Sequence, residues 1–233
     1  MADIELANLD MIFKKFKPNT VPRIFVETGT YRGDSTSVCA DKFHLTHTID
    51  LSQEWYEKAK ERFKNNKNVF CHLGDSPRVL AQLLPSIDEP ILFFLDAHYA
   101  GVYTAKGTEE NPLLREIKVI SEREYRDIII IDDANLFGRC QEGGGGNPYY
   151  PPFMLDWKDV TSGAIKENLR NKKSNFFYEI NHKQLLIFTN QSLFSCFIFR
   201  IKFISAKILT SGKLRLKIII KKFNNISGLR KKE

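Results

Sequence analysis

The sequence has few cysteines and no long apolar segment, and both absences exclude classes of protein. Its four cysteines (Cys39, Cys71, Cys140 and Cys196) are widely spaced along 233 residues and form no Cys-x-x-Cys pair. This spacing predicts free thiols in a reducing, cytoplasmic compartment and argues against a zinc site. No apolar run reaches the length of about 18 residues that suggests a transmembrane helix. The first residues, MADIELANLDMIFKKF, contain acids and lack a long apolar core, unlike a signal peptide.

Positive charge exceeds negative charge only in the C-terminal segment, residues 191–233. Residues 191–233 hold 11 Lys and Arg and one acid, Glu233, whereas the whole chain has 35 Lys and Arg against 28 Asp and Glu. Residues 1–190 therefore keep 24 basic and 27 acidic residues, a net charge of −3. A nucleic-acid partner is not expected for such a body. The basic C-terminal tail is interpreted as a solvated extension, with weak contact to phosphate or an anionic membrane surface as the alternative.

Short apolar segments alternate with segments of helical period over residues 1–190. The expected strands cover residues 23–26, 47–50, 68–72, 90–95 and 127–131, and the expected helices cover 35–43, 53–65, 77–84, 112–124 and 157–171. Two further strands, at 175–180 and 184–189, are separated by so short a connection that they predict an antiparallel hairpin. The pattern predicts an open α/β sheet, mostly parallel with one antiparallel strand, in a domain with its core at about 20–190. Residues 134–156, which contain GGGG and PYYPP, are expected to form a loop.

Acidic residues follow the predicted strands at the edge where α/β sheets bind ligands. The carboxyl ends of parallel strands meet at one edge, and ligands bind there. The acids that share this position are Glu27, Asp50, Asp75, Asp96, Asp132 and Asp133. Their alignment indicates a functional site more strongly than any single motif does.

The stretch FVETGTYRGDST combines an acid with two glycines in the pattern E-x-G-x-x-x-G, formed by Glu27, Gly29 and Gly33. It differs from the G-x-G-x-x-G of phosphate-binding loops, and its carboxylate suits a ligand with an ammonium group. Asp50 can accept two ribose hydroxyls, and Gly74-Asp75-Ser76 can contact the edge of an adenine ring. S-adenosylmethionine carries all three groups. The alternative is a tight turn in which Glu27 caps a helix.

These residues resemble the class I S-adenosylmethionine-dependent methyltransferases, and the resemblance covers roughly residues 20–190. The terminal hairpin FFYEINHKQLLIF is similar to the reversed last strand of that family. The resemblance implies a Rossmann-like sheet with strand order 3-2-1-4-5-7-6. It also implies a cofactor site formed by Glu27, Thr28, Gly29, Thr30, Gly33, Ser35, Asp50, Leu51, Gly74, Asp75, Ser76 and Asp96.

Asp96, Asp132 and Asp133 follow two apolar strands and are expected to converge if those strands are neighbours. Two like charges 4 Å apart repel by about 4 kcal/mol at an effective dielectric constant near 20, so either the pKa values of these acids rise or a cation lies among them. Oxygen ligands favour Mg²⁺. The residues resemble the macrocin O-methyltransferase type of sugar methyltransferase, which implies Mg²⁺ held by these three acids and gripping two neighbouring sugar hydroxyls. Helix capping by the Asp132-Asp133 pair is the alternative.

His98, two residues after Asp96, is the expected catalytic base, because its ordinary pKa suits proton removal at neutral pH. The alternative is a loop histidine that bonds to structure or substrate. Other residues leave two interpretations open. Tyr149, Tyr150 and Trp157 can shape an acceptor site or pack over the core, Trp55 can lie near the adenine or in the core, and Tyr31, Arg32 and Lys106 can line the pocket or face solvent.

The favoured function is a Mg²⁺-assisted O-methyltransferase whose partner is a sugar or glycan acceptor. A methyltransferase for a phenolic or other small acceptor is the second hypothesis, because catechol-type enzymes also use Mg²⁺ and an acidic pair. The third is a non-catalytic methyltransferase-like module that binds through residues 191–233. The sequence is compatible with a homo-oligomer and does not define one.

Overall fold

The computed structural model describes residues 9–10, 12–14, 21–101, 104–143, 152–180 and 183–190. The basic segment 191–233 and the tyrosines at 149 and 150 lie outside the described residues. The predictions made for them therefore remain predictions. No helix in the described part of the chain has the length and apolar character needed to cross a bilayer.

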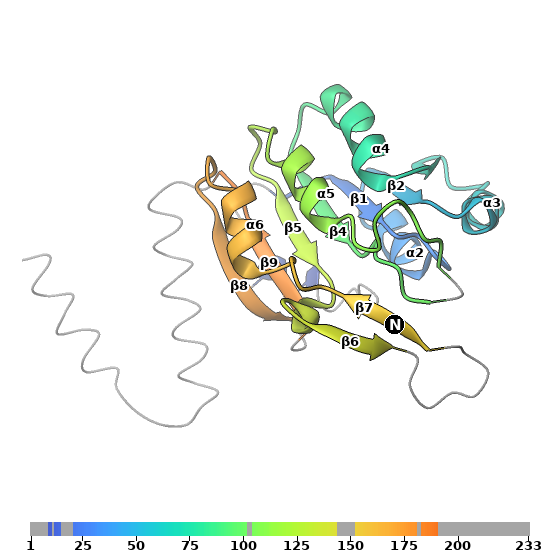
Figure 1. Cartoon of the computed structure of the whole chain (residues 1–233). Coiled ribbons are helices and arrows are strands. Elements are labelled where there is room, and N and C mark those ends of the chain that lie inside the picture. The colour runs from blue at the N-terminus through green and yellow to red at the C-terminus, as the bar shows by residue number, and fades with distance from the viewer. Residues whose placement is uncertain are drawn as a thin grey trace, which may run out of the picture. The chain divides into compact units, whose positions relative to one another are not determined.

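A seven-stranded sheet organises the described residues (Figure 1). Its strands, in sequence order, are β1 (Ile24–Thr28), β2 (Leu45–Asp50), β3 (Val69–Leu73), β4 (Ile91–Leu95), β5 (Ile128–Ile131), β8 (Asn175–Ile180) and β9 (Gln184–Phe188). Their spatial order is β3-β2-β1-β4-β5-β9-β8. The first five pair in parallel, whereas β9 runs antiparallel to both β5 and β8. The predicted order, 3-2-1-4-5-7-6 among the strands of this sheet, is confirmed.

Helices cover both faces of this sheet. They are α2 (Asp34–Ala40), α3 (Gln53–Arg62), α4 (Ser76–Leu83), α5 (Leu113–Ile120) and α6 (Ser162–Asn168), with short 3₁₀ turns η1 (Leu84–Ser86) and η2 (Ala134–Leu136). Figure 1 shows α4, α5 and α6 together on one side of the sheet. Expected helix and strand positions agree with the observed ones, and their ends differ by up to five residues.

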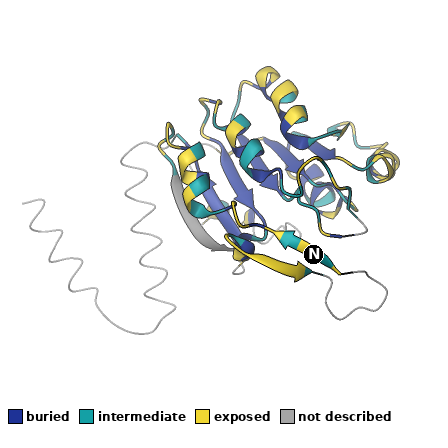
Figure 2. Ribbon diagram, in the orientation of Figure 1, coloured by how far each residue is buried: buried dark blue, intermediate teal, exposed yellow. Residues whose placement is uncertain are grey.

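The central strands are buried on both faces, as their near-continuous apolar sequence requires. Side chains of alternate strand residues point to opposite faces, so each strand serves two layers of the core. The layer beneath α4, α5 and α6 contains Val26, Phe93, Ile129, Ile187, Leu80, Ile117 and Ile165. On the opposite face, Phe25 packs against Phe43, with ring centroids 5.5 Å apart. Figure 2 shows the resulting pattern of buried strands and outward-facing, exposed helix surfaces.

The prediction of a loop over 134–156 is wrong. Residues Cys140–Gly143 form β6 and Phe153–Asp156 form β7, and the two strands pair antiparallel as a separate sheet. Half-buried Phe153 and Leu155 alternate with exposed Met154 and Asp156 along β7. That period of two is the signal for a half-buried strand, but four residues between glycines and prolines are too few to make it conspicuous.

Helix α6 begins five residues later than predicted, because Thr161 forms its N-cap. The Thr161 side chain accepts a hydrogen bond from the Ala164 backbone N–H at 3.0 Å. Trp157 to Val160 instead form a turn, in which the Val160 N–H donates to the Trp157 carbonyl. A polar N-cap fixes the helix start more firmly than the apolar period that precedes it.

A buried ion pair secures the end of the sheet opposite the carboxyl edge. The Arg123 Nε donates to Asp127 Oδ2 at 3.0 Å, and the two side chains are 5% and 1% exposed. The other guanidinium nitrogens donate to the carbonyls of Leu84, Ile87 and Glu89. A second oxygen of Asp127 accepts from the Ile91 N–H, so this network joins the starts of β4 and β5.

Replacing Arg123 by Met is expected to lower the free energy of unfolding by about 3–5 kcal/mol, because Asp127 is left buried without its cation. Urea denaturation measures this change. Arg170→Met is the matched control: Arg170 pairs with Glu167, and both side chains are about 70% exposed. The control should cost less than about 0.5 kcal/mol. Equal effects of the two substitutions would contradict a structural role for the buried pair.

Candidate functional site

A cavity of about 790 Å³ lies at the carboxyl edge of the parallel strands. This volume is in the range of small-molecule and cofactor sites. Every predicted cofactor residue lines the cavity except Thr28, whose side chain is fully buried in β1. His98, Asp132 and Asp133 line the same cavity. One space therefore contains the predicted cofactor residues, the predicted base and the predicted metal ligands.

The loop after β1 has the left-handed backbone that its glycines allow. Gly29 and Gly33 have φ values of +86° and +75°, and Tyr31 between them has φ +46°. A Cβ on Gly29 would clash with the backbone carbonyl of Asp96, so this glycine permits a close approach between the loop and the end of β4. A Cβ on Gly33 would lie 2.9 Å from the Phe63 ring. Both glycines are thus required by protein packing around the cavity.

Glu27 is buried at the base of this loop, 2% exposed. Its Oε2 accepts hydrogen bonds from the hydroxyls of Thr36, in α2, and of Thr48, in β2, the latter at 2.9 Å. Burial raises the pKa of Glu27 to about 8, although the two hydroxyls act in the opposite direction. The backbone start of α2 is not capped by a side chain, so the alternative of Glu27 as a helix N-cap is not what the structure shows.

Asp50 ends β2 with both carboxylate oxygens fixed by backbone donors. Oδ2 accepts from the Tyr31 N–H and Oδ1 from the Ser52 N–H, each at 2.8 Å. Burial raises the pKa of Asp50, with the backbone hydrogen bonds opposing that change. Asp50 lines the cavity, and a carboxylate there suits a ligand with two neighbouring hydroxyls.

Aromatic rings form the cavity wall beside Asp50. The ring centroids of Tyr31 and Trp55 are 4.4 Å apart, and the Lys58 ammonium lies 4.1 Å from the Trp55 ring centroid. All three residues line the cavity, as does Arg32. Tyr31 and Arg32, for which the alternatives were the pocket or solvent, and Trp55, for which they were the adenine site or the core, all line the cavity. Lys106 instead pairs with Glu110 at 2.6 Å and does not line the cavity.

The turn after β3 is held by two neighbouring side chains of α5 that the sequence did not single out. Arg115 Nη2 donates to Asp75 Oδ2 at 3.0 Å. The Ser76 hydroxyl donates to the carboxyl group of Glu116. Both Asp75 and Ser76 line the cavity. The only sequence signal was a glutamate on the apolar side of an amphipathic helix, between Leu113 and Ile117.

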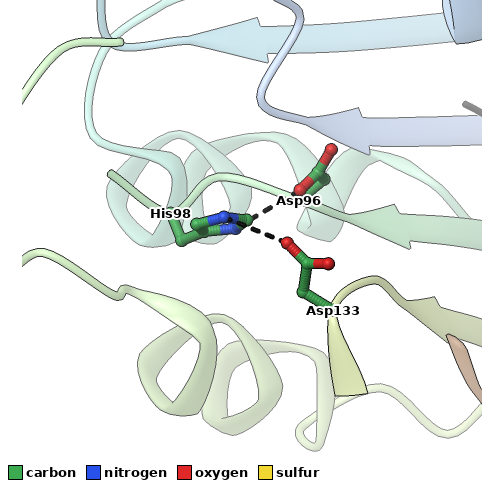
Figure 3. A group of neighbouring side chains, drawn as sticks. All are labelled: Asp96, His98 and Asp133. Atoms are coloured by element: carbon green, nitrogen blue, oxygen red, sulfur yellow. Dashed lines mark ion pairs between the residues drawn. The ribbon is translucent and has the colours of Figure 1, made fainter. Parts of the chain in front are cut away.

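His98 lies between two carboxylates at the other end of the site (Figure 3). Its Nδ1 is 3.3 Å from Asp96 Oδ1, and its Nε2 is 3.3 Å from Asp133 Oδ2. Burial disfavours the charged ring, but the hydrogen bond to Asp96 and the charges of Asp96, Asp133 and Asp132 outweigh it and raise the pKa of His98. One ligand atom from each of Asp96, His98 and Asp133 lies within 4.8 Å of the others, as a metal site requires.

Asp132 and Asp133 are adjacent in sequence but differ in their surroundings. Asp133 has φ +50°, a strained conformation for this residue, and its side chain makes no capping bond to η2. Helix capping therefore does not explain Asp133. Asp132 is 2% exposed and accepts from Gln184 Nε2 at 3.3 Å. Burial, with the charges of Asp96 and Asp133, raises its pKa to about 7. Asp132 stands beside the three-residue cluster rather than in it.

The β6–β7 hairpin and the segment between β4 and α5 form the wall next to His98. The ring of Phe153 meets the ring of Tyr99 edge to face, with centroids 5.8 Å apart, and both residues line the cavity. Trp157 is buried and packs against His98, with centroids 5.0 Å apart. Of the aromatic residues proposed for an acceptor site, Trp157 thus supports the histidine from behind, and Phe153 is an aromatic residue that sequence reasoning missed.

The comparisons with known proteins bear on the fold. Neither a scan of protein-family models nor a search of curated proteins finds a match. Among solved structures, CalS10, an amino pentose methyltransferase from Micromonospora echinaspora bound to S-adenosylmethionine, aligns with a TM-score of 0.53 and 9% identity over 79% of this chain and 90% of its own.

The chain has the fold of class I S-adenosylmethionine-dependent methyltransferases. Two other solved structures align at a lower TM-score of 0.48 and 14% identity. One is a methyltransferase from Clostridium acetobutylicum, covering 82% of this chain and 94% of its own, and the other an O-methyltransferase from Bacillus cereus in complex with S-adenosylhomocysteine, covering 80% and 81%.

Replacing Glu27 by Gln is expected to change how stability depends on pH. A carboxyl group with a pKa of about 8 when folded and 4.5 when unfolded keeps its proton in the folded protein alone between these values. Its contribution to stability is therefore complete below pH 4.5 and is lost as pH rises toward 8, by up to about 1.4 kcal/mol per pH unit. Gln cannot ionise, so the variant should gain stability relative to the parent across that window.

Urea titrations at intervals from about pH 5 to pH 8 measure this difference. Glu57→Gln, on the exposed side of α3, serves as the control for the loss of a glutamate. Parallel pH profiles for the parent protein and Glu27→Gln would mean that Glu27 ionises normally in the folded protein.

Proposed function

We propose that the chain is an S-adenosylmethionine-dependent O-methyltransferase in which His98, oriented by Asp96, removes the proton of an acceptor hydroxyl. The observation that carries the proposal is the placement of the Asp96–His98 pair in the same cavity as the β1 glycine loop and Asp50. The proposed cofactor residues and a proton acceptor thus line the same cavity. The class I fold gives that space its place at the sheet edge.

The residues of the cavity match the parts of the cofactor. Asp50 suits the ribose hydroxyls, the Asp75-Ser76 turn suits the adenine, and Glu27 and Asp96 are carboxyl groups that a cationic ligand can pair with in their ionised form. S-adenosylmethionine supplies an electrophilic methyl group on a positively charged sulfur, and transfer to the acceptor oxygen leaves neutral S-adenosylhomocysteine. A hydroxyl is a weak nucleophile until its proton is taken, which is the task assigned to His98.

His98 has the geometry of an oriented base. A hydrogen bond from Nδ1–H to Asp96 fixes the tautomer in which Nε2 accepts a proton. Trp157 packs against the ring and limits its rotation. The proton leaves the acceptor oxygen for Nε2 as the oxygen takes the methyl group, so the positive charge lost from the cofactor is matched by an imidazolium between Asp96 and Asp133.

The residues present also fit a divalent cation. Asp96, His98 and Asp133 offer two oxygens and one nitrogen within a small space, and Asp133 is held in a strained conformation toward it. As the alternative to the base role of His98, we propose that these three residues would hold the ion, with Asp132 behind them. The mixed donor set suits Mn²⁺ as well as the predicted Mg²⁺. Such an ion supplies Lewis acidity that lowers the pKa of a bound hydroxyl.

A sugar or glycan hydroxyl is the acceptor that we propose. Tyr99 and Phe153 place two aromatic rings on the cavity wall, and aromatic faces suit the apolar faces of sugar rings. CalS10, which shares the fold, is described as an amino pentose methyltransferase. A phenolic acceptor fits the same rings. An acceptor screen with labelled S-adenosylmethionine separates the two, because transfer to phenols alone would refute the sugar proposal.

Calorimetric titration with S-adenosylhomocysteine is expected to show micromolar binding that EDTA does not change, because Asp96 is the one proposed cofactor residue that also belongs to the metal cluster. Asp50→Ala should weaken that binding at least about tenfold by removing the acceptor for two hydroxyls. Asp132→Asn is the matched control at the same sheet edge and should bind normally. No binding by the parent protein would favour a non-catalytic module.

His98→Asn is expected to lower methyl transfer by about 10²–10⁴-fold while leaving the affinity for S-adenosylhomocysteine unchanged, as loss of a general base does. Single-turnover rates, measured with and without added Mg²⁺ or Mn²⁺, check this. If His98 acted only as a metal ligand, saturating cation would restore the rate of the variant. Rescue of that kind would overturn the base assignment and retain the metal site.

A further inference from the structure

Helix α5 carries a buried carboxyl group that the proposed chemistry does not use. Glu116 is 1% exposed, and the other buried residues of this helix are Leu113, Ile117 and Ile120. Burying a polar group in apolar surroundings costs free energy that one hydrogen bond only partly offsets. Burial raises the pKa of Glu116 to about 7, with hydrogen bonds to Ser76 and Thr28 acting in the opposite direction. An apolar residue at this position would serve the core better.

What Glu116 does hold is the cavity-lining turn after β3. Glu116 accepts a hydrogen bond from the hydroxyl of Ser76, the first residue of α4. The preceding residue of α5, Arg115, donates to Asp75, the residue before Ser76. Two consecutive residues of one helix therefore fix two consecutive residues of the turn. Because the helix is anchored in the core, it sets the position of the turn relative to the sheet.

The side chain of Asp75 bonds to Arg115 rather than to the start of its own helix. Asp75 occupies the N-cap position of α4, yet its carboxylate makes no capping bond. Arg115 engages Oδ2, and Asp75 lines the cavity. Asp75 thus has a second carboxylate oxygen, Oδ1, on a residue that lines the cavity. Gly74, with φ +144°, allows the chain to turn sharply just before it.

We propose that Arg115 and Glu116 are positioning residues for adenine recognition, Glu116 acting through Ser76 and Arg115 through Asp75. The inference rests on the proposed use of S-adenosylmethionine and adds the residues that set its purine selectivity. Held in place, the turn offers a carboxylate to the 6-amino group of adenine and an unfavourable acceptor–acceptor contact to a 6-oxo purine. Without the contacts to Arg115 and Glu116, the turn should bind both purines more weakly and distinguish between them less well.

The test uses the full chain, with S-adenosylhomocysteine and S-inosylhomocysteine, its 6-oxo counterpart, as probes. Ser76→Ala combined with Glu116→Leu replaces both partners of the buried hydrogen bond by apolar groups, an exchange that is close to neutral or stabilising. Glu116→Gln keeps an acceptor for Ser76 and is the conservative variant. Glu122→Leu, at an exposed position just beyond the helix, is the control. Calorimetry gives the affinities, and thermal unfolding gives Tm.

The expected result separates positioning from a merely structural role. The double variant should keep or raise Tm, bind S-adenosylhomocysteine about tenfold more weakly, and lose about tenfold of its preference over the 6-oxo probe, which corresponds to one well-placed hydrogen bond. Glu116→Gln should stay within about twofold of the parent protein in both quantities. Arg115→Met should also reduce the preference.

Three results would overturn the inference in different ways. If the parent protein binds S-adenosylhomocysteine and the double variant binds it equally well with the same preference, Glu116 does not position the turn, and the proposed function stands. If the parent protein binds neither probe, the proposed function falls together with the inference. A double variant with lowered Tm and unchanged preference would assign Glu116 to the core alone.

Discussion

The confinement of carboxyl groups at one edge of a buried sheet is the constraint on which the rest of this structure depends. Parallel strands end side by side, so the acidic residues that follow them lie close together even though their charges repel. Glu27, Asp50 and Asp132 are each held by neutral donors, namely hydroxyls, backbone N–H groups and an amide. Burial raises the pKa of all three. The cavity is thereby prepared for a ligand that brings its own positive charge. At the opposite end of the sheet, where no cavity residue lies, Asp127 has the buried cation of Arg123 instead.

This contrast shows how the fold divides stability from function. The Arg123–Asp127 pair is satisfied within the protein, and it joins strand starts that carry no ligand group. The carboxyl edge remains less well compensated, with strained backbone at Tyr31 and Asp133 beside the cavity. Backbone strain and the burial of carboxyl groups both lower the stability of the free protein, and a cationic ligand offsets the cost of burying the carboxylates. Ligand binding should therefore stabilise this edge more than the opposite one.

The regular part of the molecule follows from the sequence, and its irregular part does not. Apolar runs such as that of β5 and the short connection between β8 and β9 determine the sheet, and the acids after each strand locate the cavity. The sequence did not predict the β6–β7 hairpin, because its strands are four residues long and lie among glycines and prolines. The sequence did not predict the contact between Glu116 and Ser76, because the helical period places Glu116 on the buried face but does not indicate which hydroxyl it will contact. Such pairings depend on how α4 and α5 pack, which is a property of the tertiary structure.

The adjacent acids after β5 show the same limit at the scale of single side chains. The resemblance grouped Asp96, Asp132 and Asp133 as equals, whereas the structure brings Asp133 to His98 and leaves Asp132 against Gln184 of β9. Successive residues at the end of a strand point in different directions, so only one of two neighbours can face a given ligand. The antiparallel strand β9 supplies the partner that occupies the other. The antiparallel strand β9 therefore does more than complete the sheet. By holding Asp132, it leaves Asp96 and Asp133 as the two carboxylates between which His98 lies.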